Sequence, residues 1–138
     1  MAVTGTEGIA LLLARVLFGG VLAFMGLNHF LQTDEMVGYA QHKGLPAPRL
    51  SVIGSGALLV LGGVSLVLGV LPLLGALAVA GFLIVSAVSM HDFWAVPDEQ
   101  QQEELTNFLK NVALAGGAVA FAAFASQSWV FSVGLSIL

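Results

Sequence analysis

The chain has 138 residues, of which 58% are hydrophobic and 9% are charged, and its formal net charge is −4. Soluble globular domains carry about 25% charged residues, so this composition excludes a water-soluble fold and indicates an integral membrane protein. The acidic balance excludes nucleic-acid binding, and the absence of cysteine excludes disulfides, thiol nucleophiles and cysteine-ligated iron–sulfur clusters within these residues.

Four apolar runs are each long enough to cross a bilayer as a helix, which takes roughly 20 residues. The sequence therefore predicts an all-α membrane protein, formed as a single domain over residues 1–138. We expect an antiparallel bundle of four transmembrane helices and a short interfacial C-terminal segment. The helices are expected over about residues 8–31, 50–70, 73–94 and 97–125, and the C-terminal tail over residues 127–138.

The first helix carries one charged residue within its apolar run, Arg15, and two polar residues near its end, Asn28 and His29. A charge at that depth costs about 2.5–3.5 kcal/mol on insertion scales unless it is paired or reaches the surface. Two interpretations stay open for Arg15. Its side chain extends to the headgroups or an anionic lipid, or it faces the bundle interior, where only neutral polar side chains lie at a similar depth.

A polar loop and a glycine-rich helix follow the first helix. The segment 33–43 predicts a short interfacial helix with Tyr39 at headgroup level, stopped at Gly44. In the second helix, Gly56 and Gly63 are seven residues apart, which predicts a seam of close helix packing. The very short turn before Pro72 requires the second and third helices to form an antiparallel hairpin.

The stretch from Ser86 to Asn111 concentrates polar residues between the last two apolar runs. Proline followed by acidic residues at 97–99 is typical of a helix start, so the acids of residues 98–104 are interpreted as a solvated first segment of the fourth helix.

Four antiparallel spans place the ends of the first and third helices beside the starts of the second and fourth. We therefore expect a polar ligand-binding pocket at one membrane face, with Arg15 an additional candidate from the opposite half. The candidates at that face are His29, His91, Asp92, Asn107, Lys110 and Asn111. The pattern predicts no catalytic residue and no metal site.

Structural interpretations of the same residues remain open. Lys110 and Asp92 could form an interfacial ion pair. His91 could have a purely structural role as a hydrogen-bonding residue at the interface. His29 and His91 could also ligate a haem, although nothing in their spacing requires it. The basic residues Lys43, Arg49 and Lys110 favour a cytoplasmic pocket face, with both termini outside.

These residues resemble the DoxX family of small four-helix membrane proteins over roughly residues 8–125. The resemblance depends on Arg15 followed by Gly19 and Gly26, on GLPAP at 44–48, on LGGVSLVLG at 61–69, and on HDFW at 91–94 followed by NFLKN at 107–111. Relatives often carry a glutamate in the second helix, where this chain has only apolar residues such as Leu58 and Leu59.

The resemblance implies a multi-pass protein of the cell membrane associated with redox systems. The family name comes from a subunit linked to a terminal quinol oxidase and to thiosulfate:quinone oxidoreduction. The first hypothesis is therefore an accessory or anchoring, non-catalytic subunit of a quinone-linked redox complex, with quinone as the candidate cofactor. The alternatives are a structural scaffold without ligand and a small lipid- or solute-binding carrier. Expected partners are membrane lipid and either further copies of the chain or a larger membrane complex.

Overall fold

The computed structural model describes residues 2–135 and contains five α-helices within that range. Four are long and apolar enough to cross a membrane: α1 (Gly5–Leu31), α3 (Pro48–Leu68), α4 (Pro72–Met90) and α5 (Asp98–Ala123). The fifth, α2 (Thr33–His42), is a short helix between α1 and α3. The predicted all-α membrane fold is confirmed.

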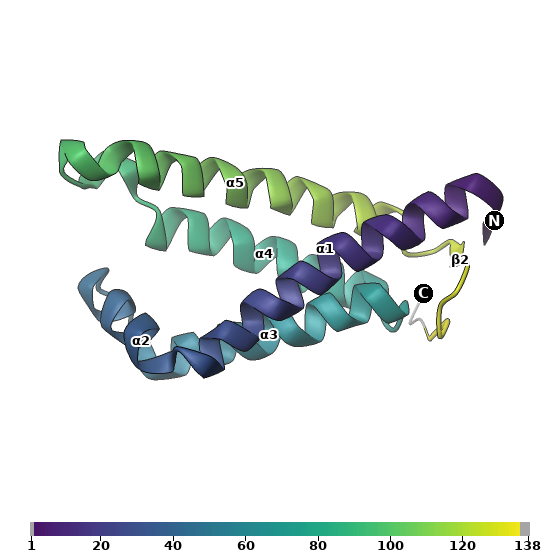
Figure 1. The fold of residues 1–138 in the computed structure, drawn as a ribbon, viewed down its shortest axis with the longest axis horizontal. Coiled ribbons are helices and arrows are strands. Elements are labelled where there is room, and N and C mark those ends of the chain that lie inside the picture. Colours follow the sequence, from purple (N-terminus) through teal and green to yellow (C-terminus); the bar gives the residue numbers. More distant parts are fainter. Residues whose placement is uncertain (1, 136–138) are drawn as a thin grey trace.

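The long helices form two pairs, α1 with α3 and α4 with α5, and α3 also packs on α4. Figure 1 shows that the pairs converge near the N-terminus and diverge towards α2. The ends of α1 and α4 therefore lie at the same end of the molecule as the starts of α3 and α5. The structure has the antiparallel arrangement from which the candidate face was predicted.

Glycines set the close contact between α1 and α3. A Cβ added at Gly19 would lie 2.5 Å from Gly63 O, and one at Gly26 would lie 2.7 Å from Gly56 O. Only hydrogen at these positions lets the two backbones approach so closely. The seam predicted from Gly56 and Gly63 is an internal helix contact of one chain.

Turn residues explain both ends of α3 and the start of α4. Gly69 adopts a φ of 68° after α3, and Pro72 is the first residue of α4. Such a φ is open to glycine at little cost, and proline suits a first helical position because its missing N–H needs no partner there. Pro48 begins α3 in the same way, two residues before the predicted start of that helix at about residue 50.

The third transmembrane helix is shorter than predicted. It ends at Met90, so His91 and Asp92 lie outside α4, and a 3₁₀ turn, η1 (Phe93–Ala95), follows. The rings of Phe93 and Trp94 pack on Phe108 of α5, with centroids 5.3 and 6.0 Å from its own. These aromatic contacts hold the turn against α5 and direct the chain away from the α4 axis.

The C-terminal tail covers the converging end of the molecule. Strand β2 (Ser128–Trp129) pairs in parallel with β1 (Ala2–Val3), and Trp129 is buried. The backbone of Val133 also donates to Leu68 O at 2.7 Å. The tail was predicted over residues 127–138, of which 136–138 lie outside the described residues.

Candidate functional site

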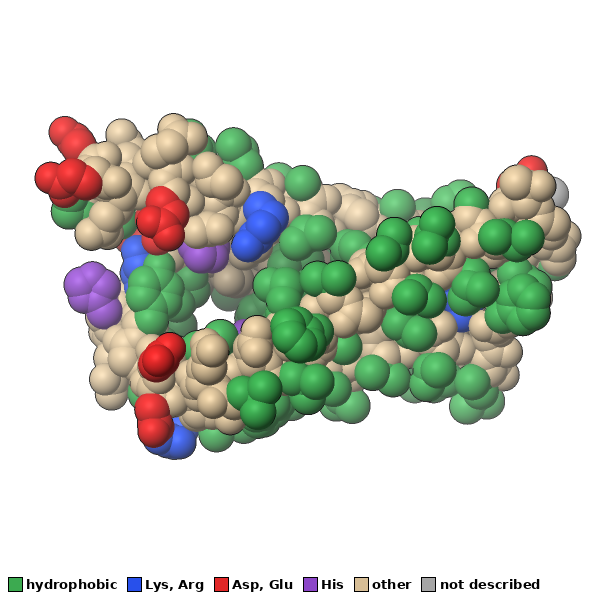
Figure 2. All heavy atoms as spheres, in the orientation of Figure 1, with side chains coloured by type: hydrophobic (Ala, Val, Ile, Leu, Met, Phe, Trp, Pro, Cys, Tyr) green, Lys and Arg blue, Asp and Glu red, His purple; other side chains and the backbone are tan. Residues whose placement is uncertain are grey.

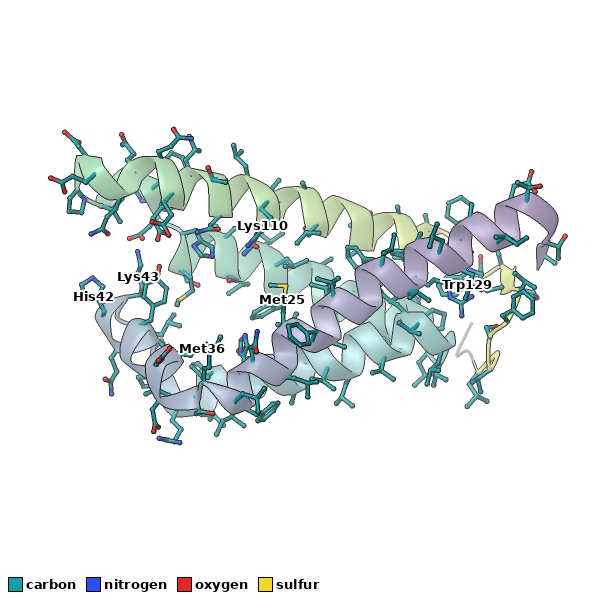
Figure 3. All side chains as sticks on the ribbon, viewed as in Figure 1. Met25, Met36, His42, Lys43, Lys110 and Trp129 are labelled. Carbon is teal, nitrogen blue, oxygen red and sulfur yellow. The ribbon has the colours of Figure 1, made fainter. Side chains whose placement is uncertain are left out.

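A cavity of about 680 Å³ separates the two helix pairs where they diverge. Its lining is mainly apolar, with Met25 of α1, Met36 of α2 and Phe82 of α4 among the larger side chains. Figure 2 shows the molecule hollowed between α2 and α5, and Figure 3 shows Met25 and Met36 directed towards the space between the pairs. This volume falls in the usual range for small-molecule sites.

Few polar side chains line the cavity, and they come from all four long helices. They are His29, Ser51, Ser55, Ser86, Ser89, Lys110 and Asn111, together with Tyr39 of α2 and His91 from the loop after α4. Asn111 is buried, and its amide donates to Ser86 Oγ at 3.4 Å, a long hydrogen bond. Lys110 points from α5 towards the space between the pairs (Figure 3).

His29 is anchored to α3 by its Nδ1 nitrogen. Nδ1 lies 3.0 Å from Val52 O and 3.0 Å from Ser55 Oγ, while Ser55 donates its own proton to Val52 O. A carbonyl oxygen only accepts, so Nδ1 carries the proton and donates it. In a neutral imidazole, Nε2 is then the acceptor nitrogen.

A second polar cluster joins α2 to the ends of α4 and α5 across the mouth of the cavity. Glu104 of α5 accepts from the Tyr39 hydroxyl at 3.0 Å and from His91 Nδ1 at 3.0 Å. Met90 O is a second acceptor for the Tyr39 hydroxyl, at 3.1 Å. Lys43, the residue that follows α2, pairs with Asp92 at 2.5 Å and lies 4.0 Å from Glu104 Oε2. Figure 3 shows Lys43 directed from α2 towards α5.

The electrostatics of this cluster keep Tyr39 a hydrogen-bond donor. Burial raises the pKa of Tyr39 well above its ordinary value, and the hydrogen bond to Glu104 raises it further. The hydroxyl therefore stays protonated at every physiological pH and continues to donate to the carboxylate. Both carboxylate oxygens of Glu104 are engaged, one by Tyr39 and the other by His91.

Arg15 lies at the opposite end and does not line the cavity. It is fully buried, and its guanidinium donates to the last carbonyls of α3 and to the tail. The acceptors are Leu66 O at 3.0 Å, Val67 O at 2.6 Å, Val130 O at 2.8 Å and Phe131 O at 3.0 Å. The guanidinium also lies 5.2 Å from the centroid of Trp129. The interior-facing interpretation of Arg15 is therefore the correct one, but its partners are backbone carbonyls.

The other candidates divide into two groups. His29, His91, Lys110 and Asn111 line the cavity, whereas Asp92 and Asn107 do not. Asp92 pairs with Lys43, so the alternative interpretation of Asp92 and Lys110 as an ion pair is not the one that the structure has. His42, which the topology also brings to this face, lies at the outer end of α2 (Figure 3).

Glu104 was missed because the acids of residues 98–104 were interpreted as solvated. The structure corrects this for Glu104, which is only 8% exposed. The helical repeat of the sequence could have indicated that Glu104 is buried. Glu104 lies seven residues before Asn111, and both share the buried face of α5 with Ala115 and Ala118. Lys43 was likewise missed as a member of the site, although it follows α2 directly and lies four residues after Tyr39, the spacing of one helical turn.

The model of the DoxX family matches residues 10–92, which include most of α1 and all of α2 to α4 and end within the cluster at the cavity mouth. Searches of curated proteins and of solved structures found no match. Within residues 2–135, no group of three His, Asp or Glu side chains is placed to hold a metal ion.

Proposed function

We propose that this chain, which belongs to the DoxX family of membrane proteins, is an accessory subunit of a redox complex that holds a quinone in the cavity between its helix pairs. The cavity is the observation that supports the proposal. It combines an apolar lining with polar groups gathered near one membrane face. A quinone has matching chemistry, with oxygens on a flat head group and an apolar tail.

The position of the polar groups favours a head group near the membrane surface. His29 lies near the end of α1, Lys110 and Asn111 lie at the middle of α5, and His91 follows α4. The deeper lining comprises Leu22, Leu59 and Leu83, which would contact the tail. The amide of Asn111 and the ammonium of Lys110 can donate to a quinone oxygen.

A scaffold without ligand is less well supported, because the glycines that suggested an oligomer seam are used inside the chain. Gly19, Gly26, Gly56 and Gly63 all face the contact between α1 and α3. They are therefore not available as a surface for a second copy.

The test is equilibrium binding of a quinone with a decyl tail to the chain reconstituted in lipid nanodiscs. Changing Asn111→Leu or Lys110→Met should weaken binding by roughly tenfold, the effect of losing one charge-assisted or buried hydrogen bond. Asn107→Leu is the matched control, since Asn107 lies one helical turn before Asn111 and does not line the cavity. Absence of binding by the unaltered chain, or equal losses in all three variants, would refute the proposal.

A further inference from the structure

The two histidines of the cavity are held in the same tautomer. His29 Nδ1 donates to Val52 O, and His91 Nδ1 donates to Glu104 Oε2, each at 3.0 Å. A neutral imidazole has one protonated nitrogen, so Nε2 is left as an acceptor in both rings. Within residues 2–135, neither Nε2 atom forms a hydrogen bond. Both Nε2 atoms are accessible, since the described residues contain no buried side-chain nitrogen or oxygen that lacks a partner. Both side chains line the cavity.

We infer that these two acceptor nitrogens make the cavity select the reduced, hydroquinone form of its ligand over the quinone. This inference rests on the proposed function and adds to it the redox state that is bound. A hydroquinone carries two hydroxyl groups, each of which donates a proton to a hydrogen bond. A quinone carries only carbonyl oxygens, which cannot donate to Nε2. A carbonyl directed at a bare Nε2 would leave two acceptors facing each other.

Glu104 is the positioning residue that fixes the tautomer of His91. Tyr39 donates to Oε1 of Glu104, so Oε2 is the oxygen that accepts from the imidazole. Glu104 is buried and sits on α5, which holds it against the loop that carries His91. The charged groups around the pair are Lys43 and Asp92, which bind each other across the same cluster.

This arrangement predicts an unusual effect of Glu104→Gln. The amide orientation that keeps the hydrogen bond from the Tyr39 hydroxyl to Oε1 turns the amide NH₂ towards His91 Nδ1. Nδ1 must then accept, and the proton moves to Nε2, which becomes a donor. A donor at Nε2 suits a carbonyl, so the preference for hydroquinone should fall and move towards quinone.

The experiment compares decyl-substituted hydroquinone and quinone for binding to the full chain in nanodiscs. Binding is measured without oxygen at pH 8, where histidine side chains are usually neutral. The unaltered chain should bind the hydroquinone roughly five- to tenfold more tightly than the quinone, which is the contribution of about one hydrogen bond. The dimethyl ether of the hydroquinone, which has no hydroxyl, should bind no more tightly than the quinone.

The variants identify the groups responsible. Glu104→Gln should reduce the preference at least fivefold, while Glu103→Gln, an exposed neighbour that loses the same charge, should leave it unchanged. The nitrogen-15 chemical shifts of His91 measure the tautomer without any ligand, and they should exchange between Nδ1 and Nε2 in Glu104→Gln.

The outcomes separate the two proposals. Equal binding of both redox forms, or an unchanged preference and unchanged nitrogen shifts in Glu104→Gln, would overturn the selection of hydroquinone and leave quinone binding intact. If neither form binds the unaltered chain, both the proposed function and this inference fail.

Discussion

Arg15 connects three segments of the chain, and its replacement by lysine tests what that connection contributes. The guanidinium donates to two carbonyls at the end of α3 and to two carbonyls of the tail, over distances of 2.6–3.0 Å. An ammonium carries the same charge as a compact point, so it can serve one of the two segments but cannot bridge both. Arg15→Lys should therefore lose at least two hydrogen bonds.

The size of the effect follows from those bonds. A hydrogen bond to a charged group contributes about 1.5–3 kcal/mol, so losing two at the tail costs about 3 kcal/mol at the lower end. Each 1.4 kcal/mol is a factor of about ten, and local opening of the tail should become roughly a hundredfold more frequent. Loss of the contact with Trp129 adds to this, because a cation over an aromatic ring contributes about 0.5–2 kcal/mol.

Hydrogen–deuterium exchange of the chain in nanodiscs measures that opening. Backbone amides of residues 128–133 should exchange roughly a hundredfold faster in Arg15→Lys, while those of α4 should not change. Arg49→Lys is the matched control, because Arg49 and Asp34 form an exposed pair with 62% and 90% of their side chains accessible. Such pairs contribute about 0–1 kcal/mol. Unchanged exchange of the tail in Arg15→Lys would show that the guanidinium does not hold it.

Three further substitutions test the packing. Gly63→Ala should lower the free energy of unfolding in detergent by about 1–3 kcal/mol, because its Cβ would lie 2.8 Å from Ala23 N. Gly20→Ala is the control and should be tolerated, because its Cβ would meet nothing within 4 Å. Equal effects of the two substitutions would contradict the predicted packing seam. Phe121→Ala should lower the free energy of unfolding by about 3–5 kcal/mol, since the ring is buried against Phe18 and Trp129. Phe124 is exposed, so Phe124→Ala should lower it far less. Similar melting temperatures for the two variants would argue against this core. Lys43→Met should speed hydrogen exchange in α2 by at least tenfold through loss of the pair with Asp92, and no change there would show that α2 is held by its apolar contacts alone.

The sequence predicted the features that depend on length, hydrophobicity and turn chemistry. The four spans follow from apolar runs, and the packing seam follows from the spacing of Gly56 and Gly63. The antiparallel order of the spans follows because each helix that crosses the membrane ends at the face where the next helix begins. These features are local, so one segment of sequence is enough to specify each of them.

The features that the sequence did not predict depend on partners far along the chain. Arg15 prompted a search for a polar side chain at its depth, but its acceptors are main-chain carbonyls of Leu66, Val67 and the tail. Every residue has a carbonyl, so no residue type marks such a partner. Lys43 and Asp92 also meet only because α2 folds back across the mouth of the cavity, and this depends on the divergence of the helix pairs.

The cavity exists because the helix pairs are tied together at both ends and separated between them. At one end, Arg15 and the rings of Phe18, Phe121 and Trp129 join α1, α5 and the tail. At the other end, the polar contacts of Tyr39 and Lys43 hold α2 to α5 and to the loop after α4. Breaking either set of contacts would free the helix pairs to move relative to each other, at a cost of about 1.5–3 kcal/mol for each charged hydrogen bond. The space between the pairs is therefore maintained by groups outside it, and the side chains that line it remain available to a ligand.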